Sequence, residues 1–138
     1  MDLDTARGFF ASSPFMVDLG VTPVAVGEGI LTATLQVAQR HMQHTGQVHA
    51  GVMAAMADHC MGSAAQTVAP AGRWAITAEL KTSQLRPGVG ERLVCEARVV
   101  KAGRNLSFTE AEVHAEQGDK RTLVMKASAT MALVEAKA

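Results

Sequence analysis

The sequence predicts an α+β fold in which a six-stranded antiparallel sheet packs against one long central helix. Residues 50–66 are rich in Ala and Met, contain no proline and have the length of a helix. Six other segments are β-branched or alternate apolar with polar residues, which is typical of strands with one buried face. The 138 residues fit one domain and contain no repeat. We therefore expect a single domain over residues 1–138.

The first elements are predicted to be a short helix and a hairpin. Residues 3–12 favour a helix, which ends before Pro14 because the residue that precedes a proline disfavours helical geometry. Residues 21–26 and 30–37 are predicted as two strands joined by a glycine-containing turn. Pro23 cannot donate a hydrogen bond to a neighbouring strand, which places the first strand at a sheet edge.

Four extended segments follow the central helix and alternate apolar with polar residues. They cover residues 76–85, 93–101, 105–116 and 122–134. Glycine-containing turns at 88–90, 102–104 and 117–119 separate them, so we expect strands that are adjacent in sequence to pair antiparallel. One helix covers only one face of such a sheet, and an oligomer would cover the rest.

The composition excludes several classes of function. Lys plus Arg equals Asp plus Glu at 13 each, so no overall charge attracts nucleic acid or an anionic membrane. No apolar run approaches the ~18 residues that a membrane crossing needs. The first residues lack the apolar stretch of a secretory signal, and both cysteines lie in apolar surroundings. We expect a cytoplasmic protein with reduced thiols and neither a nucleic-acid nor a membrane partner.

The central helix carries an aspartate on a face of small residues. Asp58 shares this face with glycines and alanines at helical spacing. Glycine inside a helix costs about 1 kcal/mol relative to alanine, so Gly51 and Gly62 indicate that another backbone or a ligand approaches there. A desolvated carboxylate is suited to act as a base or a nucleophile. An exposed Asp58, or one paired with His59 or a lysine, is the alternative.

The start of the same helix offers backbone N–H groups to a developing oxyanion. The amides of Ala50 and Gly51 lie at the positive end of the helix dipole, where they would polarise a carbonyl oxygen. Asp58 follows eight residues after Ala50, about 12 Å along a helix axis. One helix cannot place both groups on one carbonyl, so the site would need two subunits.

A motif around this helix carries a family resemblance. The sequence has Gln43, Gly46, His49-Ala50-Gly51 and Asp58 in order. It resembles the hotdog-fold thioesterases of the phenylacetate-degradation (PaaI-like) type and the 4-hydroxybenzoyl-CoA thioesterase superfamily. Their motif is Asn or Gln, two residues, Gly, two residues, His-Gly-Gly, and then a helix with Asp or Glu. The likeness runs from about residue 15 to 134, and Ala50 and Gln43 depart from the commoner Gly and Asn.

The resemblance implies a hotdog fold, in which the sheet wraps around the central helix, and an acyl-CoA thioesterase. The acyl group would be small to medium-sized, with an aromatic group open, and no cofactor is implied because coenzyme A belongs to the substrate. The family also implies a homodimer with an active site between subunits, and a homotetramer.

The resemblance assigns a role to each catalytic candidate. Asp58 would be the nucleophile or general base, and the Ala50 amide would polarise the thioester carbonyl. Gln43 would orient the attacking water or the thioester, and Thr77 would hold the water or the carboxylate. His49 is expected to hydrogen-bond its loop, with direct acid catalysis as the alternative.

Substrate-binding residues are expected at the helix start and in the turns. Gly51 follows the polarising amide. Arg86, Lys101 and Arg104 could bind the phosphates of coenzyme A through charge-assisted hydrogen bonds, or they could be solvated turn cations.

A metal site, a non-catalytic binding module, a dehydratase and a cysteine nucleophile are the competing interpretations. The residues that could supply metal ligands are His41, His44, His49, Asp58 and His59. The helix has no histidine pair on one face, so we expect no metal site. A non-catalytic hotdog module that binds acyl thioesters, or a hotdog dehydratase that uses His49 and Asp58, remains the alternative. Cys60 is expected to be a buried apolar residue rather than a nucleophile.

Overall fold

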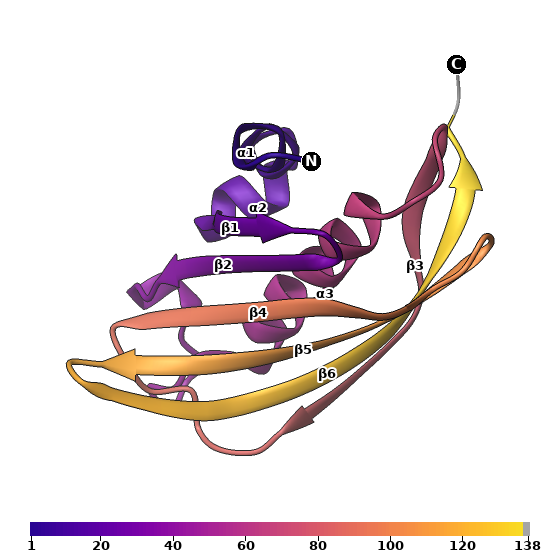
Figure 1. Ribbon diagram of the computed structural model, residues 1–138. Helices are drawn as coiled ribbons and strands as arrows, with labels where there is room; N and C mark the ends of the chain where they lie inside the picture. Colours follow the sequence, from indigo (N-terminus) through magenta and orange to yellow (C-terminus); the bar gives the residue numbers. More distant parts are fainter. Residues whose placement is uncertain (137–138) are drawn as a thin grey trace.

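The computed structural model describes residues 1–136 and shows a six-stranded antiparallel sheet that curls around one long helix (Figure 1). The strands are β1 (Val21–Gly27), β2 (Ile30–Gln36), β3 (Arg73–Gln84), β4 (Arg92–Ala102), β5 (Leu106–Gln117) and β6 (Lys120–Glu135). The long helix is α3 (Ala50–Thr67), which lies behind the sheet in Figure 1. The predicted α+β class is confirmed.

Two short helices precede the sheet, α1 (Leu3–Ala11) and α2 (Pro14–Leu19). The sequence predicted the first of them, over residues 3–12, but at Pro14 it predicted only a break. Proline also favours the first turn of a helix, because its fixed φ suits the helix and its missing N–H has no partner there anyway. Gly20 ends α2 with a φ of 81°. Among residues 1–136 no helix is both long and apolar enough to cross a membrane.

The core fills the space between α3 and the inner face of the sheet, as the alternation of apolar residues predicted. The buried inward-facing residues of the strands include Leu31, Ala33, Leu35, Leu93, Cys95, Ala97, Ala111, Val113, Ala115, Met125, Ala129, Met131 and Leu133. The register of β5 and β6 shifts between Val113 and His114. This bulge turns Val124 into the core and leaves Leu123 half-buried.

The strand order is β1-β2-β4-β5-β6-β3, so β3 pairs with β6 and not with β4. The prediction that β3 pairs with β4, the next strand in the sequence, was wrong. The connection over residues 85–91 crosses the ends of the sheet instead of forming a hairpin. Its Leu85 N–H donates to the Val124 carbonyl of β6 (2.8 Å), and its Glu91 N–H donates to the Glu116 carbonyl of β5 (2.8 Å). The chain thereby reaches β2, beside which β4 pairs.

The two edges of the sheet differ. At β1, Pro23 and an adjacent register shift interrupt the strand, and α1 packs against it (Figure 1). At β3, twelve residues run without a proline. Trp74, Ile76 and Leu80 there are 45%, 53% and 39% exposed. An unprotected edge with exposed apolar side chains favours pairing with another chain.

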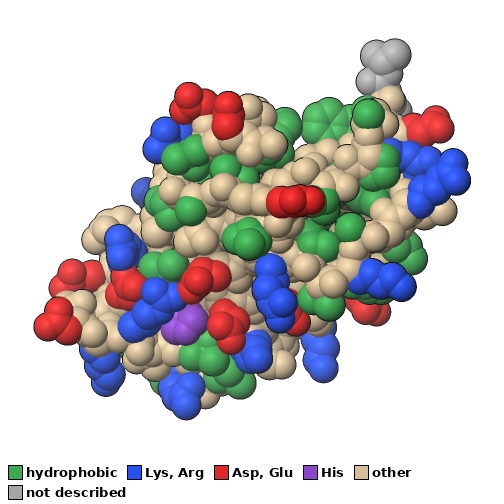
Figure 2. Space-filling model, viewed as in Figure 1, with side chains coloured by type: hydrophobic (Ala, Val, Ile, Leu, Met, Phe, Trp, Pro, Cys, Tyr) green, Lys and Arg blue, Asp and Glu red, His purple; other side chains and the backbone are tan. Residues whose placement is uncertain are grey.

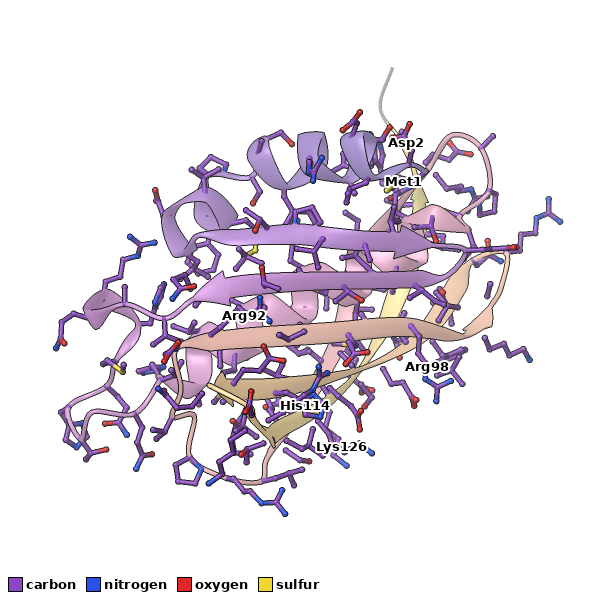
Figure 3. All side chains as sticks on the ribbon, turned by 60° about the vertical axis from the view of Figure 1, so that its left-hand side comes forward. Met1, Asp2, Arg92, Arg98, His114 and Lys126 are labelled. Atoms are coloured by element: carbon purple, nitrogen blue, oxygen red, sulfur yellow. The ribbon has the colours of Figure 1, made fainter. Side chains whose placement is uncertain are left out.

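The sheet face opposite α3 is charged (Figure 2). Its ion pairs include Arg92–Glu116, Arg98–Glu110, Arg121–Glu96, Arg121–Glu116 and Lys126–Glu112. Figure 3 labels Arg92, Arg98, His114 and Lys126, which belong to β4, β5 and β6. Acidic and basic side chains among residues 1–136 pair with one another on this face, so their charges largely offset.

Candidate active site

Asp58 lies in the middle of α3 and is bonded to the edge strand β3. The Thr77 hydroxyl donates a hydrogen bond of 2.7 Å to Asp58 Oδ1. Asp58 is half-buried, and no cation among residues 1–136 forms an ion pair with it. The structure therefore shows neither of the sequence alternatives, a fully solvated carboxylate or a pair with His59 or a lysine. It shows one of the two contacts that the resemblance implied for Thr77, the contact with the carboxylate.

A cavity of about 300 Å³ opens beside Asp58 and Thr77. The other residues of its wall are Phe9, Ser12, Ser13, His59, Gly62, Ser63, Gln66, Trp74 and Ala75. The rings of Phe9 and Trp74 meet edge to face with centroids 6.1 Å apart, so α1 covers part of this cavity. No periodic pattern in the sequence pointed to these two residues. The only hint was that Trp74 is the single tryptophan of the chain.

His59 follows Asp58 on α3 and packs against α1. Its ring meets the Phe10 ring edge to face, with centroids 4.4 Å apart. Burial lowers the pKa of His59, and the nearby Asp58 carboxylate opposes this effect only in part. A lowered pKa keeps the imidazole neutral at pH 7, so His59 does not neutralise the charge of Asp58.

The first turn of α3 is capped by His49. The Gly51 N–H donates to His49 Nδ1 (2.8 Å), which gives His49 the loop-bonding contact expected of it. A Cβ on Gly51 would lie only 2.9 Å from that nitrogen, which explains the glycine. The Gly51 amide is thus already used, whereas the Ala50 N–H has no acceptor among the described residues. Ala50 supplies the free donor at the positive end of the helix.

His41 anchors the loop that leads to this cap, a role that sequence reasoning missed. Its side chain is completely buried. Nδ1 accepts from the Ala38 N–H (2.9 Å), so Nε2 must carry the proton that it shares with the Leu19 carbonyl at 2.7 Å. The His49 N–H donates to the His41 carbonyl (2.8 Å). The one feature of the sequence that could have indicated this role is the presence of a histidine in an otherwise irregular polar segment.

Gln43 and Ala50 line a second cavity of about 340 Å³, together with Gln84 and Arg86. The Gln43 side-chain oxygen accepts from the Thr45 hydroxyl (2.7 Å) and also from the Thr45 backbone N–H. Its amide oxygen is therefore engaged within its own loop, and its NH₂ group is the part that can serve a ligand.

The predicted catalytic residues thus form two groups on one chain. Asp58 and Thr77 line one cavity, and Gln43 and Ala50 line the other. Ala50 and Asp58 are separated by about 12 Å along the helix axis. No single carbonyl group can contact both ends, as the sequence spacing indicated.

The predicted cations lie at opposite ends of β6. Arg86 is beside Val124, because its backbone N–H donates to the Val124 carbonyl. Lys101 and Arg104 lie shortly before Asn105, whose carbonyl accepts from the Leu133 N–H. Val124 and Leu133 are nine positions apart on β6, about 30 Å of strand. One chain does not bring its three cations together.

The remaining candidates are the possible metal ligands and the cysteines. Among residues 1–136 no three His, Cys, Asp or Glu side chains are grouped to hold a metal ion. Cys60 and Cys95 are both buried, and contact between the two thiols together with burial raises the pKa of Cys60 well above its ordinary value. A neutral, inaccessible thiol is a poor nucleophile.

Comparison with known proteins identifies relatives of this architecture. The sequence model of the thioesterase superfamily matches residues 45–122. A thioesterase family protein from Silicibacter pomeroyi is 27% identical, with a TM-score of 0.92 over 96% of this chain and 98% of its own. A conserved protein from Pseudomonas aeruginosa is 32% identical, with a TM-score of 0.80 over 88% and 94% of the two chains. PaaI from the phenylacetic acid degradation operon of E. coli is 18% identical, with a TM-score of 0.85 over 97% and 94%, which shows the fold alone.

Proposed function

The chain belongs to the thioesterase superfamily, and on this basis we propose that it is an acyl-CoA thioesterase that releases a free acid and coenzyme A. The membership confirms the resemblance seen in the sequence. The acyl group in this proposal is small to medium-sized, with aromatic groups included. The observation that carries the proposal is the Asp58 carboxylate, fixed by Thr77 beside a cavity that can hold an acyl group.

Asp58 supports hydrolysis in either of two ways. As a general base it takes a proton from water, whose oxygen adds to the thioester carbonyl carbon. As a nucleophile it adds to that carbon itself, and water then hydrolyses the resulting anhydride. In both routes the C–S bond breaks and the thiolate of coenzyme A is protonated. A backbone N–H at the carbonyl oxygen would stabilise the negative charge that develops there.

The free edge of β3 offers a surface to which a second subunit could bind. Two copies can pair their β3 strands antiparallel about a two-fold axis, which would cover the exposed edge of each. Inward-facing residues must then meet inward-facing residues, and the register shift between Thr77 and Glu79 must be respected. An axis at Lys81 meets both conditions and sets Thr77 opposite the partner's Gln84.

In this register the Asp58 cavity of one subunit lies next to the Ala50 cavity of the other. Thr77 lines the cavity of Asp58, and Gln84 lines the cavity of Ala50. The carboxylate of one subunit would therefore face the free amide of the partner's Ala50. The distance between Ala50 and Asp58 along one helix then no longer matters, because the carboxylate and the amide at one site come from the helices of two subunits.

The same register gathers the predicted cations at one place. Continued past Thr77, it sets the partner's Arg86 beside Ala75. Ala75 pairs with Leu133, whose N–H donates to the carbonyl of Asn105, the residue that follows Arg104 in the turn after Lys101. Neighbouring strands lie about 4.8 Å apart, so cations of both subunits would lie within the length of a coenzyme A molecule. This arrangement supports their proposed role in binding its phosphates.

The proposed enzyme acts as a homodimer or as a homotetramer built from two such dimers. Exposed Leu106 and Phe108 on the sheet supply apolar surface for the larger assembly. The reaction in this proposal needs no cofactor, since coenzyme A is part of the substrate. A cytoplasmic location, which the sequence favoured, is consistent with an intracellular acyl-CoA substrate.

The test is a hydrolysis screen of the purified full chain over acetyl-, hexanoyl-, decanoyl- and benzoyl-CoA, with free thiol as the readout. We expect thiol release from at least one ester, with one mole of free acid for each mole of thiol. A non-catalytic module would bind acyl-CoA, as seen by calorimetry, and release no thiol. That result would overturn the proposal.

A further inference from the structure

The Gln66 side chain closes one part of the free edge of β3. Gln66 lies in the last turn of α3. Its NH₂ group donates to the Arg73 carbonyl (2.8 Å), and its side-chain oxygen accepts from the Ala75 N–H (3.0 Å). A carboxamide carries the same donor and acceptor as a peptide group, so it bonds to these two residues as a neighbouring strand would.

The hydrogen bonds of the sheet show that these groups of β3 point away from β6. Ala75 pairs with Leu133 of β6, whose N–H donates in the other direction, to the Asn105 carbonyl beside β5 (2.8 Å). At such a position of an antiparallel pair, both residues direct their N–H and C=O groups away from each other. Every second residue of β3 does so, with one step lengthened by the register shift between Thr77 and Glu79. The outward-directed residues after Ala75 are Thr77, Leu80, Thr82 and Gln84.

The other end of this edge is closed by the chain itself. The N–H groups of Leu85 and Arg86 both donate to the Val124 carbonyl of β6, at 2.8 and 3.3 Å. In the part of the chain that the structure describes, β3 is therefore open to another strand only from Thr77 to Gln84. An open edge of limited length restricts the registers in which a second copy can pair.

We propose that Gln66 sets the register in which two copies pair their β3 strands. The inference rests on the proposed function, which places the site between two subunits. With the two-fold axis at Lys81, all outward-directed residues of one open segment meet those of the other. The pairs are Thr77 with the partner's Gln84 and Leu80 with the partner's Thr82. Each pair forms twice, so no backbone group of the open segment lacks a partner.

Without Gln66, a shifted register would be the better paired one. An axis at Leu80 also lets inward-facing residues meet, and it would pair Gln84 with the partner's Ala75. That pair requires the Ala75 N–H, which Gln66 occupies. The shifted register then leaves Gln84 unpaired, so the Gln66 side chain favours the axis at Lys81.

The register matters for the chemistry because it sets the distance between the two parts of the site. The shift moves the partner strand by two residues, about 7 Å. Gln84 lines the cavity of Ala50, so the partner's Ala50 amide would move away from the Asp58 carboxylate. One thioester carbonyl cannot then contact both groups. Gln66 is therefore a positioning residue, which acts on the reaction through the pairing of two chains.

The test compares Gln66→Met with a matched control, Gln39→Met. Methionine keeps the length of the glutamine side chain but cannot replace its two hydrogen bonds to β3. Gln39 is exposed and lies in the short 3-10 helix Gln39–His41. We expect kcat/KM for thioester hydrolysis to fall about a hundredfold in Gln66→Met, in keeping with the cost of misplaced catalytic groups. Gln39→Met should act as the wild-type protein does.

Single cysteines on β3 report the register without any turnover. With Gln66 present, Lys81→Cys lies on the axis and should form a disulfide with its own copy on mild oxidation, faster than Leu80→Cys. In the Gln66→Met background the order should reverse, because the axis moves to Leu80. In the Gln39→Met background the order should stay as in the wild type.

A further variant tests whether the Ala75 N–H is the cause. Proline has no N–H, and the Ala75 N–H points to the free edge, so Ala75→Pro removes this donor without breaking a bond to β6. In Gln66→Met/Ala75→Pro the shifted register loses the hydrogen bond that favoured it. Lys81→Cys should then again cross-link faster than Leu80→Cys.

The outcomes separate this inference from the proposed function. If Gln66→Met lowers the melting temperature but Lys81→Cys still cross-links faster, Gln66 only stabilises the fold and the inference is wrong. Absence of a disulfide at both positions with Gln66 present also overturns it. If no thioester is hydrolysed but the order of cross-linking reverses as expected, the enzymatic proposal fails and the role of Gln66 stands. If thioesters are hydrolysed and the order does not reverse, the inference about Gln66 fails alone.

Discussion

The Thr77 hydroxyl of β3 donates a hydrogen bond of 2.7 Å to Asp58 Oδ1 of α3. This contact ties the centre of the helix to the free edge of the sheet. A hydrogen bond to a carboxylate favours its charged form and fixes its orientation. Among the described residues only Oδ1 is bonded in this way, so Oδ2 can face the cavity.

Replacing Asp58 with asparagine should abolish most thioester hydrolysis. The side chain keeps its shape and can still accept from Thr77, but it can no longer act as a base or a nucleophile. We expect kcat to fall about 10²- to 10⁴-fold with little change in melting temperature. The control is Asp18→Asn, an exposed aspartate on α2. Turnover of Asp58→Asn equal to that of the control would exclude Asp58 from the chemistry.

The Thr77 contact should matter through its hydroxyl and not through its shape. Thr77→Val keeps the branched side chain but cannot donate a hydrogen bond, so Asp58 loses its orientation. We expect kcat to fall about ten- to a hundredfold, in keeping with the strength of a hydrogen bond to a charged group. Thr77→Ser keeps the donor and should retain most of the activity. Equal rates for the valine and serine variants would contradict the positioning role.

The proposed two-fold axis at Lys81 predicts a specific cross-link. Residues directly opposite one another in antiparallel strands have Cβ atoms about 4.5–5.5 Å apart, close to disulfide distance. Lys81→Cys should therefore form a covalent dimer on mild oxidation, detectable on a non-reducing gel. Ser83→Cys is the matched control on the same strand, and it lies too far from its own copy to cross-link.

Two results would count against this arrangement. Cross-linking of Ser83→Cys but not of Lys81→Cys would mean another register, and the partner's Ala50 would then not face Asp58. A protein that remains monomeric by light scattering at micromolar concentration while fully active would exclude a site between subunits.

His59 should make the fold less stable in mild acid. Burial lowers its pKa below the ordinary 6.5, so the unfolded chain binds a proton more readily than the folded one. Its contribution to stability is therefore present above about pH 6.5 and is lost as the pH falls further. His59→Phe keeps a ring against Phe10 and removes the titration. We expect its melting temperature to fall less than that of the wild type between about pH 7 and pH 5.

The control for this measurement is His44→Gln, which replaces an exposed histidine. It should show the same dependence on pH as the wild-type protein. If His59→Phe and wild type lose stability in parallel, His59 does not contribute to the acid sensitivity of the fold.

The sequence by itself determined the local elements and led to the prediction of a site between two subunits. Alternation with a period of two located the inner faces of β4, β5 and β6, and an Ala- and Met-rich run located α3, because both signals depend on neighbours in the chain. The family motif singled out Asp58 and Ala50, and the rise of a helix separated them. The predicted bounds of several helices and strands differ from the observed ones by a few residues. The sequence prediction missed α2, because a proline can either end a helix or begin one.

Only the tertiary structure decided how distant segments meet. The position of β3 beside β6 and the burial of His41 both join residues far apart in sequence. So does the Thr77 contact with Asp58, although the family resemblance had implied a role for Thr77 there. Such pairings depend on how the whole sheet packs around α3, and no short pattern encodes them. The same holds for Gly62, whose sequence context indicated a close approach. The folded chain instead leaves open space there, next to the carboxylate.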